Sequence, residues 1–256
     1  MTLIFRIVIA CLMVSLFFPF QSFASEEMKI VYFFDYKPFS WRDQKGQMQG
    51  FLIEAMNEAL HKRMGISIKH SGYPWARAQH MVKTGRADAF VTISTPERQS
   101  YAIMSTQHIV TEPDTVFTWK NNPDLAKLKS VRSFSDLSAF RHVQYIGNGW
   151  AENNFKGMEV RWVPTLNEVL KLLYNEHYDF FADTYLVTKY NIKSLGYHDK
   201  IIELPEVVLT SSSYRLGINK NSTFVGILPK FDLILTEMHR DGTIQRLYEK
   251  FRNFLD

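Results

Sequence analysis

Cysteine is almost absent from this sequence: Cys11, in an apolar N-terminal segment, is the only one. The chain beyond it has no thiol, which excludes disulfides, cysteine nucleophiles and cysteine-ligated zinc there. There is also no block of Lys or Arg, although 30 basic against 26 acidic residues give a net charge of +4. Charge dispersed in this way is not typical of a nucleic-acid-binding face, so we expect no nucleic-acid partner.

Several catalytic and cofactor motifs are missing as well. The sequence has no G-x-S-x-G elbow, no P-loop and no G-x-G-x-x-G, since Gly147-Asn148-Gly149 lacks the third glycine. Its eight histidines are scattered, without H-E-x-x-H or another close ligand spacing. We therefore expect no metal and no cofactor.

The N-terminus has the pattern of a secretory signal peptide. Arg6 is followed by an apolar run over 7–18 and by the small-x-small pattern of Ser22-Phe23-Ala24. This predicts a signal peptide over 1–24, cleaved near Ala24. The alternative is a retained membrane anchor, but the run is short for a spanning helix. Export without cysteine fits a bacterial periplasm better than a eukaryotic secreted domain.

Strand and helix patterns alternate twice along the rest of the chain. The β-α-β-α-β order in each half indicates a parallel sheet covered by helices, so the fold class is α/β with two units. The first unit has strands over 29–34, 66–70 and 87–93 with helices over 51–64 and 75–83. The second has strands over 143–146, 160–163 and 178–182 with helices from about Trp150 and Thr165. An extended segment at 108–119 joins them, and a strand over 214–218 precedes C-terminal helices interrupted at Asp241-Gly242.

Ligand sites in open α/β sheets lie at the carboxyl ends of the strands. Two such units facing each other would form a cleft. Near one strand end, Thr95 is suited to cap a helix and Pro96 to begin it. Arg98 then lies at the positive end of the helix, where a cation is mildly unfavourable. A bound anion would offset that term, whereas the alternative is a salt bridge to Glu97 or Asp88.

Four segments together resemble the bacterial extracellular solute-binding proteins of family 3, the periplasmic polar amino-acid-binding type, in its compact branch. They are "YKPFSWRDQKGQMQGFLIEAMNEAL", "GRADAFVTISTPERQSYAIMST", "HYDFFADTYL" and "MHRDGTIQRLYEKF". The resemblance implies a type II clamshell of two lobes, each a mixed sheet flanked by helices. Lobe 1 would comprise 25–110 plus 216–256 and lobe 2 111–215, with hinge strands near 107–118 and 209–216.

The resemblance also implies a ligand site. Arg98 matches the arginine that holds the α-carboxylate of an amino acid, and Asp183 the acid that holds its ammonium, although a longer spacing would place Thr184 there instead. Thr92 and Ser94 flank the arginine. Ile93 stands where relatives of the amino-acid type tend to carry serine, which leaves other small carboxylates open as ligands.

Further candidates come from residue chemistry near the expected cleft. Tyr36, Phe39 and Trp75 are suited to enclose an apolar or cationic part of a ligand, with core packing as the alternative. Arg77, two residues after Trp75, would favour a second anionic group. Asn148 and Trp150 lie at the start of a lobe 2 helix, within reach of the cleft.

The resemblance implies a monomeric, non-enzymatic receptor in the periplasm. It would capture a small carboxylate-bearing solute, by default a polar amino acid, and present it to an ABC-type permease of the inner membrane. One alternative is a ligand-sensing module for a separate signalling partner. Another is a dehydratase-type enzyme on the same fold, which would need a general acid in the cleft.

Overall fold

The computed structural model describes residues 26–253, so the predicted signal peptide and Cys11 lie outside the described residues. Within this range, no helix is both long and apolar enough to cross a membrane. The same residues contain no group of three or more His, Cys, Asp or Glu that could hold a metal ion.

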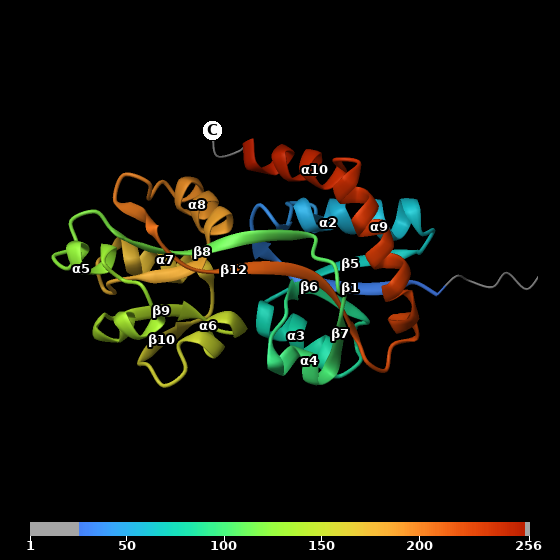
Figure 1. Cartoon of the computed structure of the whole chain (residues 1–256), viewed down its shortest axis with the longest axis horizontal. Coiled ribbons are helices and arrows are strands. Elements are labelled where there is room, and N and C mark those ends of the chain that lie inside the picture. The colour runs from blue at the N-terminus through green and yellow to red at the C-terminus, as the bar shows by residue number, and fades with distance from the viewer. Residues whose placement is uncertain (1–25, 254–256) are drawn as a thin grey trace, which may run out of the picture.

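Two α/β lobes lie side by side along the long axis of the molecule (Figure 1). A seven-stranded sheet runs through both, in the order β11-β8-β12-β6-β1-β5, with β7 paired to β12. In the first lobe β1 is parallel to β5 and β6, as the β-α-β-α-β pattern predicted, and β12 adds an antiparallel neighbour. The strands are β1 (Met28–Phe33), β5 (Ile68–Tyr73), β6 (Ala89–Ile93), β7 (Ala102–Met104) and β12 (Ile201–Asn219).

Helices of the first lobe keep close to their predicted bounds. Only α3 (Trp75–Lys83) matches completely, whereas the predicted 51–64 helix divides into α2 (Phe51–Met56) and the π-helical η1 (Asn57–Arg63). The stretch predicted as loop and turn holds a small antiparallel sheet of β2 (Asp35–Tyr36), β3 (Ser40–Arg42) and β4 (Met48–Gln49). The short α4 (Pro96–Tyr101) begins as predicted, because Thr95 accepts a hydrogen bond from the Arg98 amide and Pro96 occupies its first position.

The second lobe has two sets of strands. β9 (His142–Tyr145) and β10 (Val160–Val163) pair in parallel, and β8 (Val110–Trp119) is antiparallel to β11 (Phe181–Thr184) and β12. The strand predicted over 178–182 begins later, because Asp179 leaves the ladder and its carboxylate binds the backbone and side chain of Arg141. The helices are α5 (Leu125–Lys129), η2 (Phe134–Ala139), α6 (Gly149–Asn154), α7 (Leu166–Tyr174) and α8 (Tyr185–Ser194).

β8 and β12 extend together from one lobe to the other (Figure 1). β12 pairs with β8 from Ile201 to Tyr214 and with β6 from Tyr214 to Ile218, so the ladder changes partner at Tyr214. The predicted strand over 214–218 and the hinge strand expected near 209–216 together cover the second part of this element but miss its first part, 201–208. Pro205 conceals this first part in the sequence, whereas pairing with β8 stabilises it.

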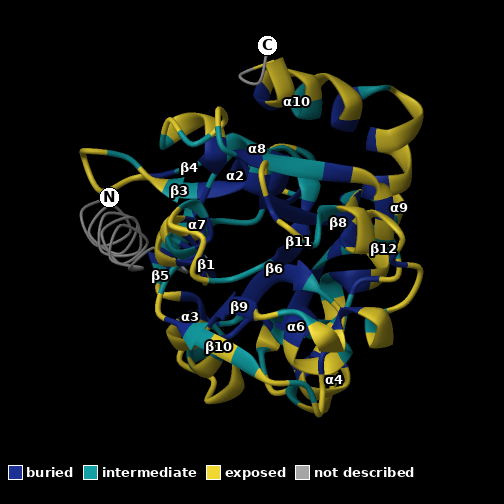
Figure 2. Cartoon of the chain, turned by 90° about the vertical axis from the view of Figure 1, so that its left-hand side faces the viewer, coloured by how far each residue is buried: buried dark blue, intermediate teal, exposed yellow. Residues whose placement is uncertain are grey.

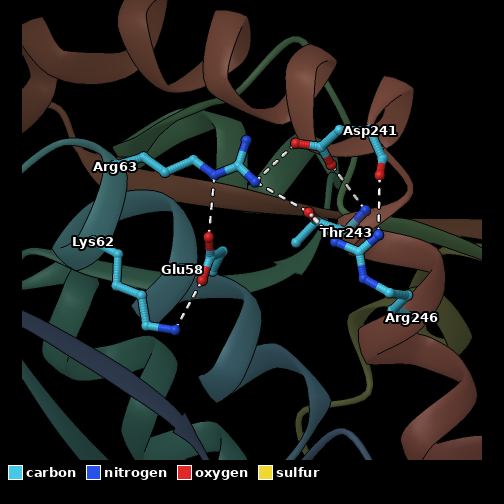
Figure 3. Close-up of polar contacts among 6 residues, drawn as sticks. All are labelled: Glu58, Lys62, Arg63, Asp241, Thr243 and Arg246. Carbon is cyan, nitrogen blue, oxygen red and sulfur yellow. Dashed lines mark hydrogen bonds and ion pairs between the residues drawn. The ribbon is translucent and has the colours of Figure 1, made fainter.

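The C-terminal helices complete the first lobe. η3 (Thr223–Ile227), α9 (Leu228–Arg240) and α10 (Thr243–Arg252) follow β12, with the predicted interruption at Asp241-Gly242. Figure 3 shows how this turn is tied to η1: Arg63 donates to Asp241 at 2.9 Å and to the Thr243 hydroxyl at 3.0 Å, and its Nε donates to Glu58. The turn is thereby anchored to the lobe that α9 and α10 cover.

Buried side chains concentrate on the strands and on the helix faces against them, while outer turns are exposed (Figure 2). The main core includes Phe90, Phe51 and Phe231, fully buried in the first lobe, and continues into the second lobe through Val143 and Tyr145. A separate cluster around Phe155, Phe180 and Val116 lies within the second lobe. The apolar contact between lobes therefore adjoins the strand ends at which the site is expected.

Candidate functional site

A cavity lies between the lobes at the carboxyl ends of the strands, where the sequence analysis expected a ligand cleft. Its walls come from β1, α3, β6 and α4 on one side and from β9, α6, β11 and β12 on the other. The lining residues are Phe33, Tyr36, Ser40, Leu52, Trp75, Val91, Thr92, Ile93, Arg98, Tyr145, Asn148, Trp150, Asp183, Thr184, Ser212 and Tyr214.

Arg98 is a buried cation without a carboxylate partner in the described chain. Only 2% of the residue is exposed. Its Nε donates to Gln79 Oε1 at 2.9 Å, its Nη1 donates to the Ile93 carbonyl at 3.1 Å, and the guanidinium lies 5.3 Å from the centre of the Trp75 ring. Burial lowers the pKa of Arg98, but a guanidinium stays protonated in proteins.

The two acids considered as salt-bridge partners of Arg98 are engaged elsewhere. Glu97 pairs with Lys83 at 3.2 Å. Asp88 accepts hydrogen bonds from the Lys29 amide at 2.8 Å and from Ser222 at 2.8 Å. The salt-bridge interpretation is therefore wrong, and the positive charge faces the cavity.

Asp183 is a buried acid with one unused oxygen. It is 4% exposed at the end of β11, and its Oδ1 accepts a hydrogen bond from the Thr184 amide at 2.7 Å. Its Oδ2 is buried and makes no hydrogen bond of normal geometry to the described residues, although the Tyr145 hydroxyl is near enough to lower the pKa of Asp183 slightly. Burial, with a smaller contribution from the nearby charge of Asp114, raises the pKa of Asp183 to about 7.

A chain of hydroxyl groups lies beside Asp183. The Tyr214 hydroxyl is 2.9 Å from that of Tyr36 and 2.8 Å from that of Thr184. Burial raises the pKa of both tyrosines well above its usual value, so they stay neutral. Asp183 and Thr184 both line the cavity, but the Thr184 hydroxyl is engaged with Tyr214, whereas Asp183 Oδ2 makes no hydrogen bond of normal geometry to the described residues.

Seven of the ten predicted site residues line the cavity and three do not. Phe39 is fully buried in the core, with its ring 5.0 Å from Tyr214 and 5.7 Å from Phe51. Arg77 is exposed and stacks on Tyr73 at 4.9 Å, because a position two residues after the inward Trp75 lies on the opposite face of α3. Ser94 is exposed beyond the end of β6. The cavity residues that the prediction contained are Tyr36, Trp75, Thr92, Arg98, Asn148, Trp150 and Asp183.

The sequence prediction missed important cavity residues. Tyr145 lies at the carboxyl end of the predicted strand over 143–146, and the rule that ligand sites lie at strand ends could have found it. Ser212 and Tyr214 lie in the hinge strand expected near 209–216, but neither was proposed as a site residue. Phe33 was assigned only to a strand, although its ring lies 5.7 Å from Tyr145 of the other lobe.

The turn Gly147-Asn148-Gly149 brings the second lobe against Arg98. Gln79 Nε2 donates to the Gly147 carbonyl at 3.0 Å, and a Cβ added at Gly149 would lie 3.1 Å from Arg98 Nη2. Asn148 caps α6 by accepting from the Ala151 amide at 3.2 Å. The glycines thus permit an approach of backbone to guanidinium that a larger residue would obstruct.

Solved structures show the same fold. A histidine kinase sensor domain with similarity to periplasmic binding proteins has a TM-score of 0.74 at 17% identity, over 88% of this chain and 96% of that one. An amino acid ABC transporter substrate-binding protein from Streptococcus pneumoniae, bound to L-arginine, has a TM-score of 0.72 at 18% identity, over 90% and 95%. The ancestral amino acid-binding protein AncCDT-1, a precursor of cyclohexadienyl dehydratase, has a TM-score of 0.70 at 24% identity, over 88% and 94%.

These likenesses establish the type II fold of periplasmic binding proteins, with its two lobes and mixed sheets. A search of curated protein sequences finds no match. The family model of the bacterial extracellular solute-binding proteins, family 3, matches residues 28–254, nearly the whole described chain. The chain therefore belongs to the bacterial extracellular solute-binding proteins of family 3.

Proposed function

We propose that this protein is a periplasmic receptor that binds an amino acid between its lobes, with the α-carboxylate on Arg98 and the α-ammonium on Asp183. The observation that carries the proposal is a pair of buried, opposite, unpaired charges in the walls of one cavity. Arg98 comes from the first lobe and Asp183 from the second, so a zwitterion would join both lobes.

Electrostatics supports this assignment. A buried charge without a partner costs several kcal/mol, and removing the cost requires an opposite charge with good hydrogen-bond geometry. A carboxylate suits the planar guanidinium of Arg98, and an ammonium suits the free Oδ2 of Asp183. Binding would shift Asp183 towards its ionised form, since a neighbouring positive charge lowers a carboxyl pKa.

Binding is proposed to hold the lobes together through a hinge in β8 and β12. We propose that the closed, monomeric form then docks on an ABC-type permease of the inner membrane. In the alternative role, a separate signalling partner binds the same closed form. The fold likeness to a histidine kinase sensor domain fits that alternative. Deleting the neighbouring permease gene, if one is present, and measuring solute uptake separates these two roles.

The test of binding uses thermal unfolding of the chain without its predicted signal peptide. The panel contains amino acids, dicarboxylates, polyamines and sugars, and a ligand at a hundred times its Kd adds about 2.7 kcal/mol. Arg98→Gln should abolish the rise in Tm, while the control Arg77→Gln, on the exposed face of α3, should retain it. A rise that persists in Arg98→Gln, or no rise with any amino acid, would contradict the proposal.

A further inference from the structure

We infer that the bound amino acid has a small, uncharged side chain, an inference that rests on the proposed function. The polar groups of the cavity wall are largely satisfied by the protein itself. The Ser40 hydroxyl donates to the Phe33 carbonyl at 2.8 Å, and Ser212 donates to Asp114 at 2.7 Å. Asn148 uses its amide nitrogen on Gln144 at 3.0 Å and its oxygen in capping α6.

Arg98 and Asp183 are the charged residues of the cavity wall. In the proposed complex, the α-carboxylate and α-ammonium engage both of them. A third charge on the ligand, positive or negative, would then be buried without an opposite partner in the described wall. Such a ligand would bind much more weakly, because desolvating an ion without compensation is unfavourable.

Asp114 is the nearby acid that could have selected a cationic side chain, but its contacts argue against this. It is 1% exposed and is not part of the cavity wall. Its Oδ2 accepts from Thr210 and Ser212 at 2.7 Å each, and its Oδ1 from Thr184 at 3.4 Å. Its hydrogen-bond capacity is directed to these hydroxyls rather than to the ligand.

Aromatic rings form the rest of the enclosure. Phe33 stacks with Tyr36 at 5.6 Å and with Trp75 at 6.5 Å, and its ring lies 5.7 Å from that of Tyr145 in the other lobe. Each of these four residues is less than a tenth exposed. Rings that pack on one another in this way offer apolar surface but little room for a large side chain.

The free space agrees with a small ligand. The volume open to the centre of a water-sized sphere is about 40 Å³. This is several times the roughly 10–15 Å³ that a single water molecule occupies, so the cavity has room for a small solute. This favours an amino acid with a short aliphatic or hydroxyl side chain over an aromatic or long one.

Isothermal titration with matched ligands tests the inference. Norvaline and 2,4-diaminobutyrate have nearly the same shape, and differ by a terminal methyl against an ammonium; asparagine and aspartate form a second pair. We expect alanine, serine or norvaline to bind, and each charged member to bind at least a hundredfold more weakly than its neutral counterpart. Phenylalanine and tryptophan should bind more weakly than alanine.

The outcomes separate the two proposals. Tighter binding of a charged member, or of an aromatic amino acid, would overturn the inference on side-chain class while the amino-acid receptor stands, provided Arg98→Gln abolishes that binding. If no α-amino acid of the panel binds, the proposed function fails, and the inference fails with it.

Discussion

Gln79 holds Arg98 and the second lobe at the same time. Its Oε1 accepts from Arg98 Nε at 2.9 Å, and its Nε2 donates to the Gly147 carbonyl at 3.0 Å. The oxygen of this amide therefore orients the guanidinium that we assign to the ligand carboxylate. The nitrogen of the same amide contacts the turn that starts α6. We infer that Gln79 is a positioning residue, which links the orientation of Arg98 to contact between the lobes.

Replacing Gln79 by Ala should weaken ligand binding by roughly tenfold or more, because a hydrogen bond to a charged group contributes about 1.5–3 kcal/mol. Gln79→Glu gives a sharper result. A carboxylate there would pair with Arg98, so the Tm of the ligand-free protein should rise while affinity falls. Isothermal titration and thermal unfolding measure both, with Gln99→Ala on the exposed face of α4 as control. Parallel losses of stability and affinity in both variants would reduce Gln79 to a structural residue.

Gly147→Ala should weaken binding, because an added Cβ would lie 3.1 Å from the Ala76 amide nitrogen and from Gln79 Nε2. Gly157→Ala is a matched control: both glycines have φ of +86°, but a Cβ at Gly157 meets nothing within 4 Å. Both variants should lose about 1 kcal/mol of stability from backbone strain. Only Gly147→Ala should raise the Kd and increase the radius of gyration in the presence of ligand, measured by small-angle scattering. Equal affinities in the two variants would count against this contact.

Asp183→Asn should raise the stability of the ligand-free protein at pH 8 and change it little near pH 4. The pKa of Asp183 is about 7 in the folded protein and near 4 in the unfolded chain. Its neutral form therefore favours folding below pH 4, and this contribution is lost as the pH rises to about 7. The Tm difference between variant and wild type, measured at pH 4.5 and pH 8, should grow with pH. A difference independent of pH would refute the raised pKa.

His142→Phe should protect the protein against acid. His142 is buried between Phe155 at 4.2 Å and Phe180 at 4.3 Å, with neither ring nitrogen hydrogen-bonded to the described residues. Burial lowers the pKa of His142 to about 3, below the value near 6.5 of the unfolded chain. The unfolded state therefore gains a proton first, and stability is lost as the pH falls from about 6.5. The Tm advantage of His142→Phe should be larger at pH 5 than at pH 8, with the exposed His80→Gln as a control substitution.

Local patterns were sufficient to predict most of the first lobe. The amphipathic helix over 75–83, the cap at Thr95 and the interruption at Asp241-Gly242 depend on neighbouring residues, and each is confirmed. The long β12 depends on pairing with β8, a partner distant in sequence, and its proline conceals its first part. Pairing between strands that are distant along the chain cannot be predicted from the local pattern of one sequence.

The charged part of the site was predictable and its enclosure was not. Arg98 stood out as a cation at the wrong end of a helix, and Asp183 followed an apolar strand. Tyr214 lies in a strand that was expected, but nothing local marked it as a cavity residue, and Gln79 resembled any polar residue of an exposed helix face. Arg77 was included and Gln79 overlooked because helical spacing was not applied: position 77 lies two residues after Trp75 on the opposite face of α3, whereas position 79 lies four residues after it on the same face.

The division of Arg98 and Asp183 between the lobes has a consequence for the fate of the protein in the cell. If the solute contacts both residues, it completes an ionic link between the two lobes. When the solute is scarce, this link is absent. The empty receptor would then open more often and expose backbone to proteases, while the loaded one resists them. Nutrient supply would thus set the lifetime of the receptor as well as its occupancy.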